Sequence, residues 1–400
     1  MNGLKSIDAA TAEALAVFSG PIFLDGLGTL SDAAAAALAT HRSMLSLNGL
    51  TTLSDEAAKA LAEHKNFLTL NGLTTLSDKA AAELAKHKGD WLFLNGLPTL
   101  SDAAAKALAQ NRGDYLSLSG LTTLSEAAAK ALSQYRGNNL YLNGLTKLSD
   151  AAAKALTERK STRSGLHLNG LTTLSYEAAE ALAQHDGRLL SLNGLTTLDA
   201  DTAKALAEFK GWSLGLSGLT TLDAASAKAL VEFKGVLHLD GLTRFDADTA
   251  KALAEFKGQR LSLGRLTTLS DEATKALTQQ NGFSLSLHGL TTLSPEAAKE
   301  LAAVQKWDGE LRSLTALDTA DSVAVAQSLA TRKGPLELPN LKKISPKTLY
   351  ALIEKKDVEI PLIETLELIP EPDGSPTEDF VIPEWLEERQ KQKRAEQAAE

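Results

Sequence analysis

The chain has 400 residues, no cysteine and a formal net charge of −9 at pH 7. The missing cysteines exclude a disulfide framework and a thiolate metal site, and they fit a reducing compartment, so a cytoplasmic protein is predicted. No basic face is visible in this acidic sequence, which argues against nucleic-acid binding. Its apolar runs are short and interrupted, so no membrane span is expected, and no secretory signal pattern opens the chain.

One unit of about 24 residues recurs along most of the chain. Its consensus is L-x-L-N-G-L-T-T-L-S-D-x-A-A-x-A-L-A, and the glycine of the G-L step recurs from Gly49 to Gly241 at intervals of 23 to 26 residues. A fixed period of this length is typical of a solenoid. We therefore expect stacked units in place of one large globular core.

The unit over residues 45–72 predicts the local structure of all the others. Residues 45–47 alternate apolar and polar side chains, which indicates a short, half-buried strand. Gly49 then predicts a turn with positive φ. Ser54, followed by two acids and an alanine-rich run, predicts the N-cap of a helix. In later units a lysine and a glycine, as at Gly211, predict the helix C-cap.

This pattern resembles that of leucine-rich repeat proteins. The matching motif is L-x-L-x-G-L, as in residues 68–73, and the likeness covers about residues 3 to 353. Where the family has its asparagine this chain has a leucine, such as Leu73, and the asparagine instead follows the strand leucine directly, as Asn71 does. The resemblance implies an atypical, alanine-rich subclass with an α/β solenoid fold. It also implies a parallel sheet on the concave side, short helices on the convex side, and partner binding on the sheet.

The sequence divides into three regions. Residues 1–305 are predicted to be regular repeats, and residues 306–355 to be degenerate C-terminal capping repeats. Residues 356–400 are predicted to be a linker rich in proline and acid, followed by a mobile tail for which a helix is an alternative.

The N-terminal end of the repeats is predicted to be a bare sheet edge. Residues 21–24 form an apolar strand, and no polar capping repeat precedes them. Such an edge tends to pair with another chain, so a homodimer through this edge is expected. The alternative is that residues 1–18 fold as a helical cap over the first strand.

A histidine recurs at one position near the end of the helix, in His41, His64, His87 and His185. Packed helices lie about 8–10 Å apart, whereas zinc ligands all lie about 2 Å from the metal. Other units hold asparagine, tyrosine, arginine or phenylalanine at this position. A structural role is therefore predicted, with no metal and no cofactor.

Aromatic side chains gather on the outward positions of the early strands. Strands repeat at about 4.8 Å, so these side chains should form one contiguous patch. Exposed patches of this kind mark interaction sites, whereas cross-strand packing that only stabilises the sheet is the alternative. The predicted partner-binding residues are Met44, Phe67, Trp91, Phe93, Tyr115 and Tyr141.

The sequence contains no recognisable set of nucleophile, base and acid, and no phosphate-binding loop. The predicted function is therefore a non-enzymatic scaffold for protein–protein interaction that binds a partner on the concave sheet. Two alternatives remain open. The aromatic rings would also suit a glycan-binding module, and the repeats would also suit an architectural or self-assembling spacer.

Overall fold

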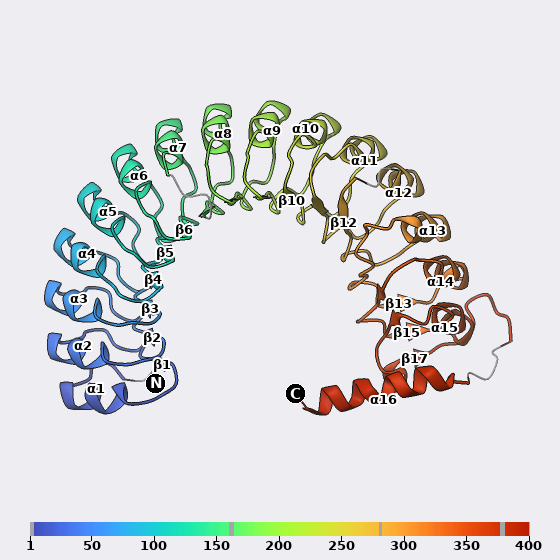
Figure 1. Ribbon diagram of the computed structural model, residues 1–400, viewed down its shortest axis with the longest axis horizontal. Coiled ribbons are helices and arrows are strands. Elements are labelled where there is room, and N and C mark those ends of the chain that lie inside the picture. The colour runs from blue at the N-terminus through green and yellow to red at the C-terminus, as the bar shows by residue number, and fades with distance from the viewer. Residues whose placement is uncertain (1–3, 160–163, 280–281, 377–380, 400) are drawn as a thin grey trace. The chain divides into compact units, whose positions relative to one another are not determined.

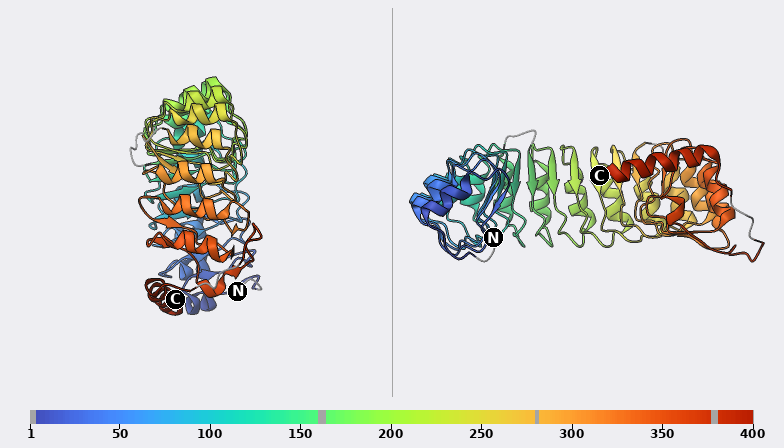
Figure 2. Two further views of the ribbon diagram at one scale, coloured as in Figure 1. Left: turned by 90° about the vertical axis from the view of Figure 1, so that its right-hand side faces the viewer. Right: turned by 90° about the horizontal axis from the view of Figure 1, so that it is seen from below.

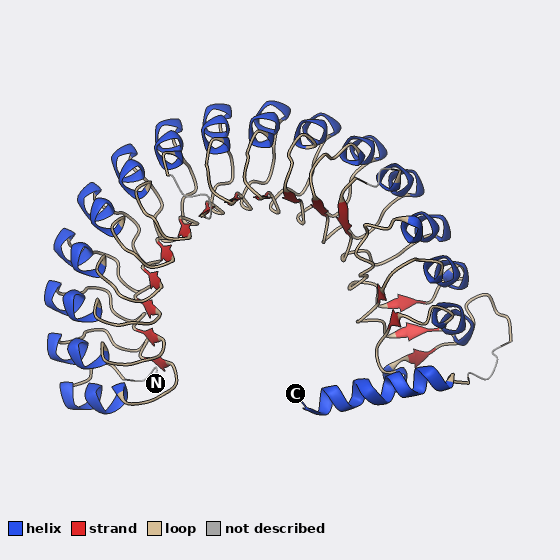
Figure 3. Cartoon of the chain, viewed as in Figure 1, coloured by secondary structure: helices blue, strands red, loops and turns tan. Residues whose placement is uncertain are grey.

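The computed structural model describes residues 4–159, 164–279, 282–376 and 381–399. The chain forms two compact units, Met1–Gly218 and Leu219–Glu400. In each unit a strand alternates with a helix, which confirms the predicted α/β solenoid (Figure 1). Within each unit the strands line the inner side of the curve and the helices lie on its outer side (Figure 3).

The first unit holds nine described strands of two or three residues and nine described helices of seven or eight residues. Its strands are β1 (Ile22–Phe23), β2 (Leu45–Ser46), β3 (Leu68–Thr69), β4 (Trp91–Phe93), β5 (Tyr115–Ser117), β6 (Asn139–Tyr141), β7 (Gly165–His167), β8 (Leu189–Ser191) and β9 (Ser213–Gly215). Its helices are α1 (Ala9–Ala16), α2 (Asp32–Leu38), α3 (Asp55–Leu61), α4 (Asp78–Leu84), α5 (Asp102–Leu108), α6 (Glu126–Leu132), α7 (Asp150–Thr157), α8 (Tyr176–Ala183) and α9 (Ala200–Ala207).

The second unit continues the same alternation and then becomes irregular. Its strands are β10 (Val236–His238), β11 (Arg260–Ser262), β12 (Ser284–Ser286), β13 (Ala316–Leu317), β14 (Leu336–Glu337), β15 (Lys343–Ile344), β16 (Val358–Glu359) and β17 (Glu367–Leu368). Its helices are α10 (Ala224–Leu230), α11 (Ala247–Ala254), α12 (Asp271–Thr278), α13 (Pro295–Ala303), α14 (Ser322–Ala330), α15 (Pro346–Ile353), the 3₁₀ helix η1 (Ile363–Thr365) and α16 (Glu384–Ala399).

The repeated leucines set both the strand register and the core. Neighbouring strands are parallel and in register, so Leu68 lies opposite Leu92, which in turn lies opposite Leu116. These leucines are fully or almost fully buried. Each repeat therefore adds one layer of leucine to the core, and no single repeat can bury its leucines alone.

The helices begin where the sequence predicts and pack side by side. The Ser54 side chain accepts a hydrogen bond from the N–H of Ala57, which confirms it as the N-cap of α3. The buried face of each regular helix consists mainly of alanine with one leucine, as in Ala57, Ala58 and Leu61 of α3. Small side chains allow close helix stacking, which Figure 2 shows for the orange helices of the second unit.

The repeat glycines have a different role from the predicted one. Among the described glycines only Gly309, Gly334 and Gly374 have positive φ, so the positive φ predicted for Gly49 is wrong, and so is the left-handed C-cap predicted at Gly211. A Cβ built on Gly49 would lie 2.4 Å from the carbonyl oxygen of Asp25 in the preceding turn. These glycines are therefore needed because stacked turns approach too closely for a side chain.

The C-terminal region contains ordered structure in the stretch expected to be a linker. Strands β13, β15 and β17 form one parallel sheet, and β14 and β16 form another. Helix α16 then contacts residues 356–364 through side-chain hydrogen bonds. Residues 377–380, within the same predicted linker, lie outside the described residues.

Candidate functional site

Strand register assembles an aromatic surface on the inner side of the first unit. We define this aromatic surface by its six predicted members. Trp91 on β4 lies opposite Tyr115 on β5, and Phe93 and Tyr141 lie in the neighbouring row of the same sheet. Each of the six side chains is at least partly open to solvent. They are Met44, Phe67, Trp91, Phe93, Tyr115 and Tyr141.

Four of these rings contact one another. The rings of Trp91 and Tyr115 lie face to face, with centroids 3.6 Å apart and planes 10° apart. Phe67 tilts against Trp91 at 4.9 Å and 52°, and Phe93 stacks on Trp91 at 5.6 Å. Such pairs contribute about 0.5–1.5 kcal/mol beyond the area that they bury. The surface therefore stiffens the sheet as well as presenting apolar area.

His167 on β7 extends this surface, and the sequence did not identify it as a site residue. Its ring stacks on Tyr141 with centroids 4.1 Å apart, and its Nε2 lies 3.0 Å from Oδ1 of Asn139. Burial, and then the positive charge of Arg159, lowers the pKa of His167 to about 4. The ring is therefore neutral near pH 7 and acts as a flat, aromatic neighbour of Tyr141. The sequence signal was its register position opposite Tyr141.

The stacking decides which parts of the rings a ligand can reach. Trp91 lies between Phe67 and Tyr115 in strand order; Tyr115 covers one of its faces, and Phe67 meets it at a tilt of 52°. The ring edges, the hydroxyl of Tyr115 and the ring faces that no neighbour covers remain for a ligand. Stacking of a sugar or a cation needs a free ring face, whereas an apolar side chain packs equally well against ring edges.

The histidine column lies in the helix layer, away from the strand surface. His41, His64 and His87 are buried, with ring centroids 6.3 and 6.2 Å apart. Rings stacked in parallel at this spacing cannot both direct a nitrogen to one metal ion. The described residues contain no group of three histidine, cysteine or acidic side chains that could hold a metal.

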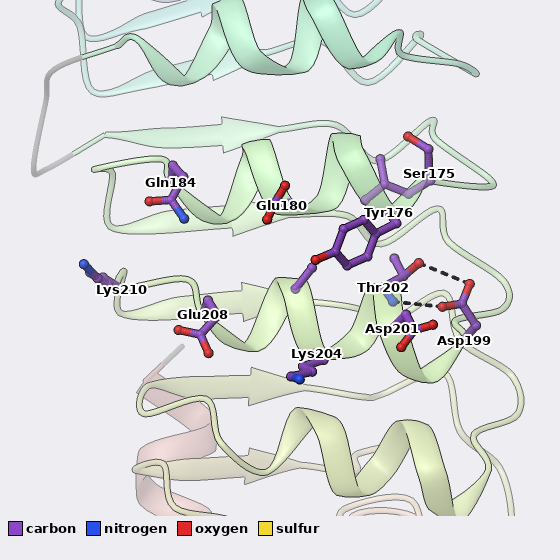
Figure 4. Close-up of a pocket in the computed structure, with 12 residues that line it drawn as sticks. Ser175, Tyr176, Glu180, Gln184, Asp199, Asp201, Thr202, Lys204, Glu208 and Lys210 are labelled. Atoms are coloured by element: carbon purple, nitrogen blue, oxygen red, sulfur yellow. Dashed lines mark hydrogen bonds between the residues drawn. The ribbon is translucent and has the colours of Figure 1, made fainter.

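A groove of about 730 Å³ opens between α8 and α9 on the outer side of the first unit (Figure 4). Tyr176 lies across it, and the charged side chains of Glu180, Lys204 and Glu208 surround it. Asp199 in its wall is the N-cap of α9 and accepts hydrogen bonds from Thr202. The groove mixes acidic and basic side chains around an open lining, so its geometry favours no particular ligand.

A serine, a histidine and two acids also meet on the inner side of the second unit. Nε2 of His288 lies 3.0 Å from Oγ of Ser286, 3.0 Å from Oδ2 of Asp308 and 3.1 Å from Oε2 of Glu310. In a catalytic triad the histidine uses one nitrogen for the serine and the other for the acid. One nitrogen faces all three groups in this cluster, so the arrangement does not support proton relay.

The same two carboxylates are also neutralised by arginines. Arg260 lies 3.2 Å from Asp308, and Arg312 lies 2.6 Å from Glu310. Arginine at these distances occupies the oxygens that a cation would need. The cluster therefore connects strand β11 to the segment that follows the last regular helix, and it is best described as an ion-pair network.

No described helix of the chain combines the length and the apolar character needed to cross a bilayer. No protein-family model matches the chain, and neither does any curated protein.

Two solved structures of complexes are similar to it at low identity. One is the Toll–Spatzle complex of Drosophila, with 14% identity, coverage of 74% of this chain and 42% of the other, and a TM-score of 0.44. The second is the TLR13–ssRNA13 complex, with 18% identity, coverage of 88% and 57%, and a TM-score of 0.46. The chain thus spans about half the length of those proteins. Likenesses this weak carry no argument, so the assignment of a leucine-rich-repeat-like solenoid rests on the repeated strand, turn and helix.

Proposed function

We propose that this leucine-rich-repeat-like solenoid is a non-enzymatic scaffold that binds a protein partner through the aromatic surface on its inner sheet. The observation that carries the proposal is the cluster of Phe67, Trp91, Phe93 and Tyr115, whose rings remain partly exposed on the sheet. Large aromatic side chains of this kind dominate the energetics of protein interfaces. The missing cysteines fit a cytoplasmic setting for the interaction.

The occupied ring faces favour a protein partner over a glycan. Sugars bind aromatic platforms through the ring face, and the close stack of Trp91 on Tyr115 leaves no room for a sugar between these two rings. Apolar side chains of a protein partner would pack against the exposed edges and displace little ordered water. Nucleic acid is a poorer candidate still, because single-stranded bases also need free ring faces and a basic groove.

A second copy of the chain is a further proposed partner, at strand β1. Val17, Phe18 and Phe23 are exposed apolar side chains around this strand. Among the described residues no strand pairs with the outer side of β1. An open strand edge with apolar neighbours is prone to pair with another chain.

The binding proposal is tested by paired variants on the aromatic surface. Trp91→Ala with Tyr115→Ala should remove capture of a partner from native lysate, measured by quantitative mass spectrometry. The matched control is Ser213→Ala with Ser284→Ala, on strands without aromatic residues. Because the ring pairs also stabilise the sheet, some loss of melting temperature is expected; circular dichroism must match the wild type and the variant must remain folded at the assay temperature for the result to count. Unchanged capture by the aromatic variant would refute the proposal, and binding of the wild type on a glycan array would favour the alternative.

A further inference from the structure

The buried histidine column has an unusual feature for polar side chains. Both ring nitrogens of His64 and of His87 lack a hydrogen bond of normal geometry within the described structure, and so does Nε2 of His41. The backbone groups near these rings, at Ala39 and Phe67 for His64 and at Asn66 and Gly89 for His87, oppose the lowering of the pKa only in part. Nδ1 of His41 lies 3.3 Å from the carbonyl oxygen of Ala16 on α1. Buried polar groups are nearly always paired, so three stacked rings with this deficit need an explanation.

The surroundings of the column oppose a positive charge on the rings. Helix α1 contributes only the Ala16 carbonyl among the described contacts, and its one acid, Glu13, is exposed. Basic side chains outnumber acidic side chains around the histidine column, and one of the acids, Glu63, already pairs with Lys88. The charged groups that face the column are Arg42, Glu63 and Lys65 beside His41, and Lys86, Lys88, Asp90 and Arg112 beside His87.

Protonation is therefore unfavourable in the folded state. Burial, and then repulsion from His64, lowers the pKa of His87 to about 4. Burial, and then His41, lowers the pKa of His64 as well. An unfolded histidine has a pKa of about 6.5, so the unfolded state binds more protons between these values.

Later repeats provide an internal contrast at the same position, with one exception. His185 is also buried with both ring nitrogens unpaired, and burial lowers its pKa to about 4, so its repeat shares the deficit. Asn111 bonds to the Ala85 carbonyl and Tyr135 to the Gly113 carbonyl, so both replace histidine with paired polar groups. Phenylalanines follow further on, all buried and none able to titrate. They are Phe209, Phe233 and Phe256.

We propose that the stacked column of His41, His64 and His87 makes the repeats around α2, α3 and α4 an acid-sensitive segment. As the pH falls, these repeats open while the repeats that hold phenylalanine at this position keep their fold. The folded-state pKa values of His64 and His87 are depressed, that of His87 to about 4, so this stability is present above about pH 6.5 and is lost as the pH falls. Local opening is feasible because each repeat contacts only its neighbours. The proposal does not depend on what binds the aromatic surface.

The test compares denaturant unfolding of the full chain at several values between about pH 7 and about pH 4. The double variant His64→Phe with His87→Phe copies the side chain of the later repeats, and His64→Asn with His87→Asn copies Asn111. Proton linkage predicts that the unfolding constant of the wild type rises with acid by up to about tenfold per pH unit for each histidine. Each double variant removes two histidines, so its unfolding constant should rise with acid less steeply than that of the wild type, by up to about a hundredfold per pH unit.

Hydrogen exchange, corrected for the intrinsic rate at each pH, locates the opening. Protection should fall in peptides from residues 32–93, with the repeat of His185 as the one later repeat that shares this behaviour, and should persist in those from 200–257. Three outcomes would overturn the proposal: equal pH dependence in wild type and both variants, loss of protection that starts in repeats without a buried histidine, or rings of His64 and His87 that titrate near their ordinary pKa in the native protein by NMR. If the phenylalanine variant fails to fold, the asparagine variant and the wild-type NMR titration still decide.

Discussion

At the position after each strand, one side chain connects a repeat to the next. Oδ1 of Asn48 accepts the N–H of Asn71 at 2.8 Å, and Oδ1 of Asn71 accepts the N–H of Asn95 at 3.0 Å. In the second unit Oδ1 of Asp240 accepts the N–H of Gly264 at 2.7 Å. The stacked turns hide these N–H groups from water, so each needs an acceptor from the neighbouring repeat.

We predict that Asn71→Leu lowers the free energy of unfolding by about 1–3 kcal/mol, because it leaves the N–H of Asn95 without its acceptor. Asn71→Asp should retain most of the stability, since Asp240 fills the same role elsewhere. Urea unfolding of both variants measures the difference. Equal loss in both would show that the amide, and not the acceptor oxygen, matters.

The glycine of the turn gives a second prediction at the residue scale. A Cβ on Gly72 would lie 2.0 Å from the carbonyl oxygen of Asn48, so Gly72→Ala must push two turns apart. We expect it to cost about 1–3 kcal/mol of unfolding free energy. Gly28 is the matched control, because nothing lies within 4 Å of the corresponding Cβ, and Gly28→Ala should be neutral or slightly stabilising. Urea midpoints of the two variants that coincide would contradict this account.

At the scale of the helix, N-caps obey a rule that links adjacent repeats. The Ser54 hydroxyl donates to Asp32, the first residue of the preceding helix, and Ser77 donates to Asp55 in the same way. Where the N-cap is itself an acid, as Asp199 is, the preceding helix begins with Tyr176. Two carboxylates at these positions would repel, which explains why the two choices change together.

This rule predicts a sign reversal in a double-mutant cycle. Tyr176→Asp should destabilise the wild type slightly, by at most about 0.5 kcal/mol, because the new carboxylate faces Asp199. The same change in an Asp199→Ser background should be neutral or stabilising, since a serine N-cap can donate to it. Thermal melts of the four proteins in low salt give the coupling. A coupling near zero would mean that Tyr176 was selected for another reason.

The elements show which features the sequence could predict. Strand, turn and helix follow from the leucine spacing and from N-caps such as Ser54, because these depend on local chemistry. The close approach that requires Gly72 depends on the distance between stacked turns, which no single repeat encodes. The strand register places Trp91 opposite Tyr115, and the sequence predicts this. The centroid distance of 3.6 Å between the two rings depends on their rotamers, which the sequence does not predict.

In the second unit, helix α16 covers the strand that ends the repeats. Arg389 donates to the carbonyl oxygens of Lys356 and Val358, and Lys393 donates to that of Ile360. Side chains of the helix thus satisfy edge carbonyls that would otherwise meet water or another chain. The sequence did not identify this role because α16 has no sustained apolar face: Leu386 is buried, and most of the other contacts are polar.

We predict that Arg389→Ala with Lys393→Ala releases α16 and exposes the edge of β16. Proteolysis after residue 381 should become faster, while the repeats of the first unit keep their protection in hydrogen exchange. The matched control is Lys391→Ala, at an exposed position of the same helix. If the wild-type tail is already cleaved as fast as in the variant, the tail is mobile, as the sequence alone predicts.

For the chain as a whole, the remaining prediction concerns association through strand β1. Helix α1 packs beside α2 in the helix layer, and Phe23 on β1 stays 45% exposed, so the described residues leave this edge open. The other edge of the same twelve-stranded sheet, at β12, is partly covered because Leu285 bridges to Trp307, which disfavours head-to-tail chains and favours a closed, symmetric pair. Light scattering over a concentration series should therefore show a dimer. Phe23→Lys should abolish it by placing a charge on the edge, whereas Tyr176→Lys in the outer groove should not. A wild type that stays monomeric at every concentration, with amide protection at Phe23, would show that the edge is closed in solution.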